Sequence, residues 1–460
     1  MCTIIHHISS YIKGLLFLAV MVLNLGTHQL RAELYPEDFL TPDNPYKVST
    51  AKDLVDVFDA FNDCFDFNAE WGDTFSISLE ADIDMSGIEF TPVQKEEAVP
   101  VKIEGNGYTI KNLTFTGIES SYSGLFPHLG DGSVIRNINF DSINVSLPSK
   151  NCAILAGLVS GQVEISDCSI TNGVVAYTVP NKALNIGGLV SVVNVGSTFE
   201  CKNITVDLDY KVDIEARSFG GVVGYLNNPS FLNLSNVTNR SKKTLVIGTV
   251  EYGIGGILGL IQADKVKIKV NDCFNYMNIE SGSPTVGGIV GYYSKPEDKT
   301  IINELYNCTN AGDISSEYGD VGGIVGHSSF VKIYNSVNIG DLSSYDPTFG
   351  TKDIKEQIRG IGGIGGIVGT YMVKRINVMD FTLSSCVNLG YVSHTLEGNA
   401  AGIVGGYKSV EEYNVSENNL FPSKIFPFQN CLSLSTDGTN RIVKDFEFST
   451  TPGYNYIGGL

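Results

Sequence analysis

The sequence predicts an all-β fold, a right-handed parallel β-helix of about nine coils with an N-terminal capping helix. A Gly-aliphatic-aliphatic motif recurs at steps of 31 to 43 residues, and repeats of that length are typical of stacked structural units. The segments between the motifs are interrupted every few residues by Gly, Asn, Asp or Ser. They therefore fit short strands and not the paired helices of a helical solenoid.

Residues 1–32 have the pattern of a secretory signal peptide. Lys13 precedes an apolar stretch from Gly14 to Leu25, and the small residue Ala32 ends the less apolar segment that follows. A membrane anchor is the alternative, but the apolar stretch is shorter than the roughly 20 residues that a spanning helix needs. We therefore expect a secreted or cell-surface protein with no transmembrane segment in the mature chain.

Residues 33–95 are predicted to form an N-terminal cap, because an open β-helix end would expose its apolar interior and unpaired strand edges. Ser49 or Thr50 can serve as the N-cap of an amphipathic helix. The apolar residues at helical spacing in this helix are Leu54, Val57, Phe58 and Phe61. After it, residues 74–79 alternate like a strand, and residues 101–113 begin the first coils.

Residues 96–460 are predicted to form the β-helix itself. Equivalent positions of successive coils should lie above one another, so the motif glycines are expected at corners that need positive φ or close packing. The copies of the motif begin at Gly124, Gly157, Gly188, Gly221, Gly256, Gly288, Gly323, Gly366 and Gly402.

A second block recurs between these glycines, as in Leu305, Cys308, Asn310 and Ile314. We expect the Cys or Ser of each block to form an inward ladder of small side chains, and the Asn to hydrogen-bond to the next coil. This spacing favours buried thiols over disulfides or metal ligands, although the rung separation sterically allows a bridge. The cysteines assigned to this ladder are Cys168, Cys201, Cys273, Cys308, Cys386 and Cys431.

Ligand binding is predicted on aromatic residues and long loops. The repeat is least regular at residues 343–360 and 407–426, and loops on a rigid scaffold often carry binding chemistry, although a surface insertion without a role is the alternative. Three tyrosines follow the Gly-aliphatic motif, and a histidine is assigned to the same position. Such an aromatic strip can hold sugars or merely complete the packing between coils. The candidate ligand-binding residues are Tyr225, Tyr292, His327, Tyr345, Tyr407 and Tyr413.

The sequence offers no recognisable catalytic, cofactor or metal site. It has no His-Glu-x-x-His zinc helix, no Gly-x-Ser-x-Gly nucleophile elbow and no Asp-x-Asp-x-Asp-Gly calcium loop. The formal net charge of −19 makes nucleic acid a poor partner, because an acidic surface repels phosphate. We therefore predict no catalytic residue, no cofactor and no metal.

The glycine motif resembles the GLUG repeat, named for its Gly-Leu-x-Gly pattern. The matching segments are residues 79–86, 103–113, 123–126 and 135–138, followed by the later Gly-Gly-Ile-Val-Gly copies, and the likeness covers roughly residues 45–405. The resemblance implies a secreted or surface β-helix of Bacteroides-type bacteria, similar to adhesins and to the non-catalytic N-terminal parts of metallo-IgA-peptidases. The peptidases' zinc motif is missing, so no catalytic residue is carried over.

Three hypotheses for function follow. The first is a non-catalytic extracellular or cell-surface scaffold for adhesion or ligand binding, with a host glycoprotein or glycan as partner. The second is a carbohydrate-active β-helix enzyme, either a polysaccharide lyase or a glycoside hydrolase. The third is the stalk of a longer surface protein: the sequence stops at residues 457–460 within a repeat-like motif, which fits either a degenerate last strand or truncation.

Overall fold

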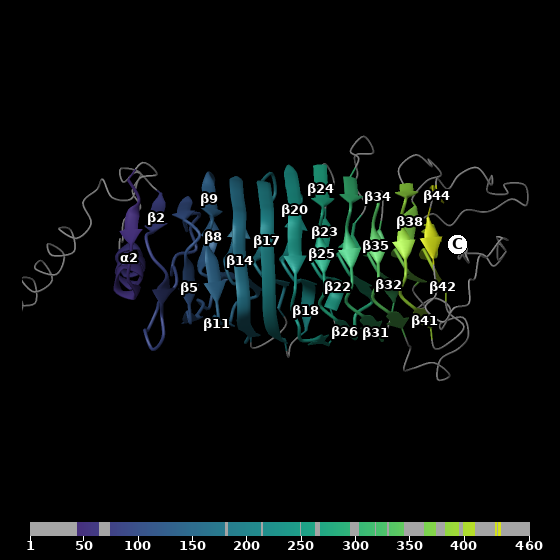
Figure 1. Ribbon diagram of the computed structural model, residues 1–460, viewed down its shortest axis with the longest axis horizontal. Helices are drawn as coiled ribbons and strands as arrows, with labels where there is room; N and C mark the ends of the chain where they lie inside the picture. The colour runs from purple at the N-terminus through teal and green to yellow at the C-terminus, as the bar shows by residue number, and fades with distance from the viewer. Residues whose placement is uncertain are drawn as a thin grey trace, which may run out of the picture.

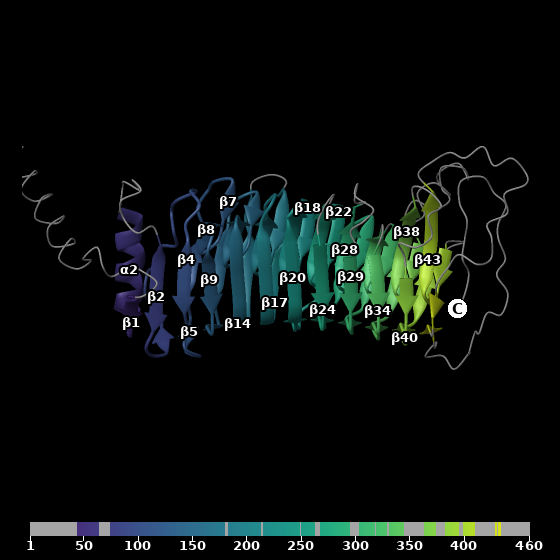
Figure 2. The same cartoon turned by 90° about the horizontal axis from the view of Figure 1, so that it is seen from above.

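The chain winds into an elongated parallel β-solenoid of about nine turns in the computed structural model (Figures 1 and 2). This confirms the predicted fold class. The coils follow one another along the long axis, from α2 and β1 at one end to β44 near the other. The structure describes residues 44–63, 74–179, 183–212, 215–248, 250–262, 267–294, 303–317, 319–328, 331–344, 363–373, 382–394, 399–409, 428–429 and 431–433.

Four parallel sheets run along the solenoid. From β20 onward, each coil passes through the first, fourth, second and third sheets in that order. The first sheet has 22 strands: β1 (Tyr46–Val48), β2 (Phe75–Leu79), β3 (Ile83–Asp84), β4 (Val101–Glu104), β5 (Thr109–Lys111), β6 (Thr114–Thr116), β9 (Ser133–Arg136), β10 (Asn139–Asp141), β11 (Asn144–Leu147), β14 (Gln162–Tyr177), β17 (Thr198–Val212), β20 (Phe231–Asn239), β24 (Lys267–Asn271), β25 (Phe274–Asn275), β29 (Asn303–Tyr306), β30 (Thr309–Asn310), β34 (Val331–Tyr334), β35 (Val337–Asn338), β39 (Thr382–Ser384), β40 (Val387–Asn388), β44 (Phe428–Gln429) and β45 (Leu432–Ser433).

The other three sheets complete the wall. The second sheet contains β7 (Tyr122–Ser123), β12 (Asn151–Cys152), β15 (Asn185–Gly187), β18 (Ala216–Gly220), β22 (Val250–Gly255), β27 (Thr285–Gly287), β32 (Asp320–Gly322), β37 (Gly363–Gly365) and β42 (Asn399–Ala401). The third contains β8 (Phe126–Leu129), β13 (Ala156–Val159), β16 (Val190–Val193), β19 (Val223–Asn227), β23 (Leu258–Gln262), β28 (Val290–Tyr293), β33 (Val325–Ser328), β38 (Val368–Val373) and β43 (Val404–Ser409). The fourth contains β21 (Leu245–Ile247), β26 (Ile279–Ser281), β31 (Ile314–Ser316), β36 (Leu342–Ser344) and β41 (Val392–His394).

The predicted capping helix is α2 (Ala51–Asp63), and it packs on the first coils. Thr50 is its N-cap: the Thr50 hydroxyl accepts a hydrogen bond from the Asp53 amide at 3.2 Å, and the Asp53 carboxylate accepts one from the Thr50 amide at 2.9 Å. The ring of Phe58 lies 5.0 Å from that of Phe75 and 5.8 Å from that of Phe126. The four predicted apolar residues are all buried, so α2 covers the N-terminal end of the interior.

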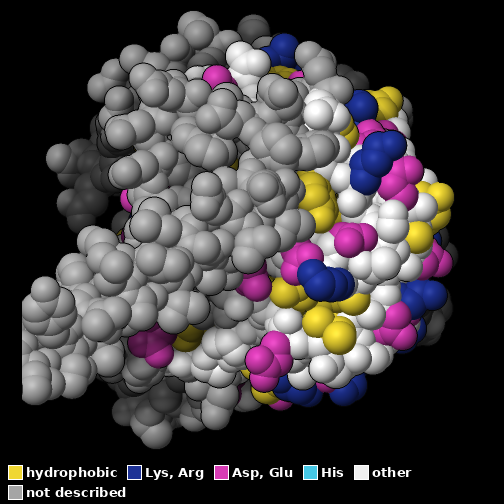
Figure 3. All heavy atoms as spheres, turned by 90° about the vertical axis from the view of Figure 1, so that its left-hand side faces the viewer, with side chains coloured by type: hydrophobic (Ala, Val, Ile, Leu, Met, Phe, Trp, Pro, Cys, Tyr) yellow, Lys and Arg dark blue, Asp and Glu magenta, His cyan; other side chains and the backbone are white. Residues whose placement is uncertain are grey.

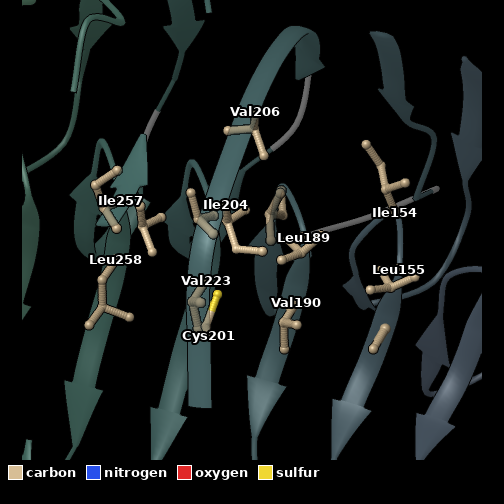
Figure 4. Close-up of a cluster of buried hydrophobic side chains, with 14 of the residues drawn as sticks. Ile154, Leu155, Leu189, Val190, Cys201, Ile204, Val206, Val223, Ile257 and Leu258 are labelled. Atoms are coloured by element: carbon tan, nitrogen blue, oxygen red, sulfur yellow. The ribbon is translucent and has the colours of Figure 1, made fainter. Parts of the chain in front are cut away.

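The aliphatic pairs of the motif stack in columns inside the solenoid, as predicted. Val190 pairs with Val223, and Val223 with Leu258, and all three are buried (Figure 4). One motif copy was assigned wrongly from the sequence. Ala156 pairs with Val190, so Gly157 aligns with Ser191 and not with Gly188, and Ile154 takes the motif glycine's place.

The Cys ladder forms with one exception. Cys168, Cys273, Cys308, Ser336 and Cys386 are buried in one column. Cys431 continues this column but is only partly buried. Cys201 belongs to a neighbouring column, because it pairs with Ile165 and Leu234. Among the described cysteines no disulfide is formed.

The predicted Asn contacts form a continuous ladder through four coils. The Asn275 amide donates to the Asn310 side-chain oxygen at 2.9 Å, Asn310 donates to Asn338 at 2.8 Å, and Asn338 donates to Asn388 at 2.8 Å. The motif glycines lie directly across from it: a Cβ on Gly323 would come within 2.4 Å of the Asn338 Cγ and 2.2 Å of the Gly366 oxygen. Close approach to the ladder, and not positive φ, therefore requires glycine at this position.

Candidate functional site

Three of the candidate ligand-binding residues lie in one column on the third sheet. Tyr225 pairs with Leu260, Leu260 with Tyr292, and Tyr292 with His327. The rings of Tyr292 and His327 are stacked, with centroids 4.7 Å apart and an interplanar angle of 6°. The full column is His128, Leu158, Val192, Tyr225, Leu260, Tyr292, His327, Thr370 and Gly406.

Tyr407, a fourth candidate, does not join this column. Tyr407 was assigned to it wrongly, because Gly406 pairs with Thr370 and Tyr407 pairs with Tyr371, one position further along. The extra glycine of the Gly405-Gly406 pair causes the shift. Tyr345 and Tyr413 lie outside the described residues, as does most of the two long loops.

Residues of the second sheet extend the aromatic column sideways. The Arg217 guanidinium lies 5.0 Å from the centroid of the Tyr225 ring and 5.1 Å from that of Tyr252. The Tyr252 ring in turn meets Tyr292 edge-on at 6.3 Å. Cation–π and edge-to-face contacts of this kind join the three tyrosines across three coils.

At His327 the aromatic contacts end in a largely buried polar cluster around Asp320. The Asp320 carboxylate accepts a hydrogen bond from Thr370 Oγ1 at 2.5 Å and from the Gly363 amide at 3.1 Å, and its other oxygen lies 2.7 Å from His327 Nδ1. His327 Nε2 is buried and has no hydrogen-bond partner in the described part of the chain. Burial, with a smaller contribution from the Asp320 charge, raises the pKa of the Tyr292 hydroxyl.

Packing between coils accounts for most of these aromatic and polar side chains, which lie along the seam where the second and third sheets meet. Tyr225 is 5% exposed and His327 4% exposed, so neither presents a ring face to a ligand. Tyr252 is 38% exposed and Tyr292 is half-buried at the edge of the seam. The aromatic strip therefore stabilises neighbouring coils, and only its edge at Tyr252 is accessible.

Asp320→Asn should lower the free energy of unfolding by roughly 1–2 kcal/mol. The asparagine oxygen can still accept from Thr370 and Gly363, but the charged partner of His327 is lost. Urea unfolding followed by circular dichroism would measure the change. The exposed Asp313→Asn is the control, and equal stability losses in the two variants would contradict the assignment.

A second surface, which was not predicted from the sequence, has a row of outward apolar side chains. It is an apolar stripe on the outer face of β25, β30, β35, β40 and β45, where inward Cys, Ser and Asn alternate with outward residues that are apolar except for Thr309. Tyr276 is 50% exposed and Ile339 49% exposed. The apolar stripe comprises Phe274, Tyr276, Ala311, Val337, Ile339, Val387, Leu389 and Leu432.

The apolar stripe begins abruptly along two columns of the first sheet. In one column, the outward residues Ser169, Thr205 and Thr238 are followed by Phe274, Thr309 and Val337, so Thr309 interrupts the apolar run once. In the other, Tyr276, Ala311, Ile339 and Leu389 follow the Asn ladder, whereas Arg240 follows Asn239. Exposed apolar side chains in a continuous row mark an interaction surface more often than scattered ones do.

Outside the apolar stripe, charged side chains are interspersed with exposed apolar ones, among them Val195, Val246 and Tyr306. Outward acids of β17 are held in ion pairs with lysines, including Asp207 with Lys242 and Asp209 with Lys211. Seen from the N-terminal end, acidic and basic side chains are interspersed with small hydrophobic patches in the described surface (Figure 3). The concentration of apolar side chains over successive coils thus distinguishes the apolar stripe.

One edge of the apolar stripe is acidic. Asp313 and Asp341 are neighbours in one column beyond this edge, because Ile314 pairs with Leu342, and Glu280 lies in another column with Ser315 and Ser343. Asp313 accepts a hydrogen bond from the Asp341 amide at 2.8 Å, which keeps this edge ordered from one coil to the next. At the bend before the stripe, Asp272 is followed on later coils by the uncharged Asn307, Asn335 and Ser385. An apolar strip with one acidic edge favours a partner with apolar side chains and with basic side chains along that edge.

The described residues show neither a metal site nor a membrane-spanning helix. No group of three or more His, Cys, Asp or Glu side chains in this part of the chain is arranged to hold a metal ion. Its helix is also too short and too polar to cross a membrane.

Comparison with known proteins gives a distant structural likeness. No protein-family model and no curated protein matches the chain, so the GLUG likeness remains a resemblance. Among solved structures, the chain is similar to a Bacteroides ovatus protein described as a "putative immunoglobulin A1 protease", at 16% identity and a TM-score of 0.38 over 91% of this chain and 93% of that one.

Proposed function

We propose that the protein is a non-catalytic scaffold for adhesion or ligand binding at the outside of the cell, and that the apolar stripe is its binding surface. The observation that carries this proposal is the change of one outward column from Ser169, Thr205 and Thr238 to Phe274, Thr309, Val337, Val387 and Leu432, in which Thr309 is the one polar residue. The inward positions between β25 and β40 are filled by Cys, Ser and Asn, so these apolar side chains have no role in the core.

A polypeptide ligand fits the apolar stripe better than a sugar chain. Sugars stack on flat aromatic rings, whereas five of the eight residues of the apolar stripe are large and aliphatic: Val337, Ile339, Val387, Leu389 and Leu432. Phe274 and Tyr276 at its start provide the aromatic anchors common at protein interfaces. The acidic edge disfavours a second copy of this chain and favours basic side chains on the partner. The protein part of a host glycoprotein would meet these requirements.

Val337→Asp should weaken binding at least about tenfold, because about 1.4 kcal/mol is enough for that loss and a carboxylate in an apolar contact costs more. The probes are immobilised mucin and fibronectin, each native and enzymatically deglycosylated, together with the released glycans. Affinity would be measured by surface plasmon resonance on the full chain, after circular dichroism confirms that the variant is folded.

Thr205→Asp is the matched control, since Thr205 occupies the same column in the polar part of the sheet. The proposal predicts binding that survives deglycosylation, falls with Val337→Asp and is unchanged by Thr205→Asp. Binding to the released glycans alone, no binding to any polypeptide probe, or equal affinities for the two variants would contradict it.

A further inference from the structure

Cys386 and Cys431 are neighbours at the end of the inward Cys column. Val387 pairs with Leu432, and the Leu432 amide donates to the Cys386 oxygen at 2.9 Å. The two residues that precede this pair therefore lie side by side on adjacent rungs. Their thiols are in hydrogen-bond contact, and the Cys431 thiol also donates to the Leu383 oxygen at 3.6 Å.

Neighbouring strands of a sheet lie about 4.8 Å apart. Cα separations of about 4.4–6.8 Å are compatible with a disulfide, so the backbone need not move far to form one. Both side chains point inward from the same column, which brings the sulfur atoms to the same side of the sheet. The pair is thus arranged for a bridge between rungs.

Exposure separates this pair from its counterpart deeper in the solenoid. Cys273 and Cys308 are also neighbours in the column, because Phe274 pairs with Thr309, but both thiols are fully buried. Burial raises the pKa of the Cys273 thiol, and the contact with Cys431 together with burial raises that of the Cys386 thiol, so the reactive thiolate is scarce at both buried cysteines. Cys431, in contrast, is only partly buried and is open to a small oxidant.

We propose that Cys386 and Cys431 form a disulfide when the protein meets a small-molecule disulfide. The Cys431 thiolate attacks the oxidant RSSR, forming a mixed disulfide and releasing one thiolate RS⁻. The Cys386 thiol loses its proton and attacks the Cys431 sulfur, which releases the second RS⁻. Two cysteine thiols are oxidised and one RSSR is reduced to two RSH, so atoms and electrons balance.

The bridge would fix the two rungs that carry the end of the apolar stripe. Val387 and Leu432 are the outward residues next to Cys386 and Cys431. Closing the loop between the two cysteines restricts the unfolded chain and holds β40 and β45 together. The inference does not depend on what the apolar stripe binds.

The test treats the full folded chain with oxidised glutathione, quenches with iodoacetamide and maps the peptides by mass spectrometry without reduction. A cross-linked peptide pair containing Cys386 and Cys431 is expected, with the intact mass of the unquenched protein lower by two hydrogens. Cys386→Ser should instead accumulate glutathione on Cys431, and Cys431→Ser should abolish both products.

Cys273→Ser is the matched control and should leave the Cys386–Cys431 product unchanged. Stable glutathione on Cys431 of the unmutated chain, without the cross-link, would overturn the proposal, because it would show an accessible thiol that Cys386 cannot reach. An unmodified Cys431, or its linkage to any other cysteine, would overturn it as well.

Discussion

Gly323→Ala should destabilise the solenoid by roughly 3 kcal/mol or more, at or above the upper end of what overpacking usually costs. A Cβ at this position would lie 2.2 Å from the Gly366 oxygen and 2.4 Å from the Asn338 Cγ. The backbone of the next coil on one side and the Asn ladder on the other leave no room for this Cβ, so two adjacent coils would have to separate. The urea midpoint measured by circular dichroism should fall clearly.

Gly248→Ala is the control for this prediction. Gly248 lies in an exposed segment just after β21, where a Cβ would have no atom within 4 Å and the backbone has no positive φ, so alanine should be tolerated there. Similar urea midpoints for Gly323→Ala and Gly248→Ala would mean that the coils do not approach each other as closely as described.

Asn310→Leu should cost about 2–6 kcal/mol, because each buried polar group left without a partner costs roughly 1–3 kcal/mol. The change preserves the approximate size of the side chain. It leaves the Asn338 side-chain oxygen and the Gly312 carbonyl without their donor, whereas the Asn275 amide loses one of two acceptors and keeps the Met277 oxygen. Chemical unfolding would measure the loss.

Removing the whole Asn ladder gives a second, independent readout. With all four ladder residues changed to leucine, the unmatched side-chain amides disappear together, so the cost per substitution should be smaller than for Asn310→Leu alone. Earlier coils show that apolar residues are compatible with this inward position, since Ile170 and Val206 are buried there. Strictly additive losses would contradict a cooperative ladder.

Much of the fold was predictable because stacked coils repeat their chemistry. The Gly-aliphatic pairs, the Asn contacts and the capping helix each follow from local patterns whose physical meaning does not depend on distant residues. The positions of Gly157, Cys201 and Tyr407 were wrong for one shared reason. Register is set by pairing across coils, and a few inserted or deleted residues shift it while leaving the local motif intact: the shift is one residue at Tyr407 and three at Gly157 and Cys201.

The sites were less predictable than the fold. Tyr225, Tyr292 and His327 do share a column, but their burial depends on Arg217, Tyr252 and Asp320, which come from another sheet. The apolar stripe had a signal in the sequence: segments such as Cys273-Phe274-Asn275-Tyr276 place apolar residues opposite the inward Cys and Asn. Alternation then requires the apolar residues to face outward.

The central claim is that equivalent residues of successive coils stack in register, one rung above another. Lys102 and Lys269 lie five rungs apart in one outward column, and Lys102 and Lys332 lie seven rungs apart. Double electron–electron resonance between spin labels at these positions, attached through non-natural side chains, should give distances near 24 Å and 34 Å, since each rung adds about 4.8 Å. Distances that do not grow in proportion to the number of rungs would contradict the stacked solenoid and the apolar stripe that depends on it.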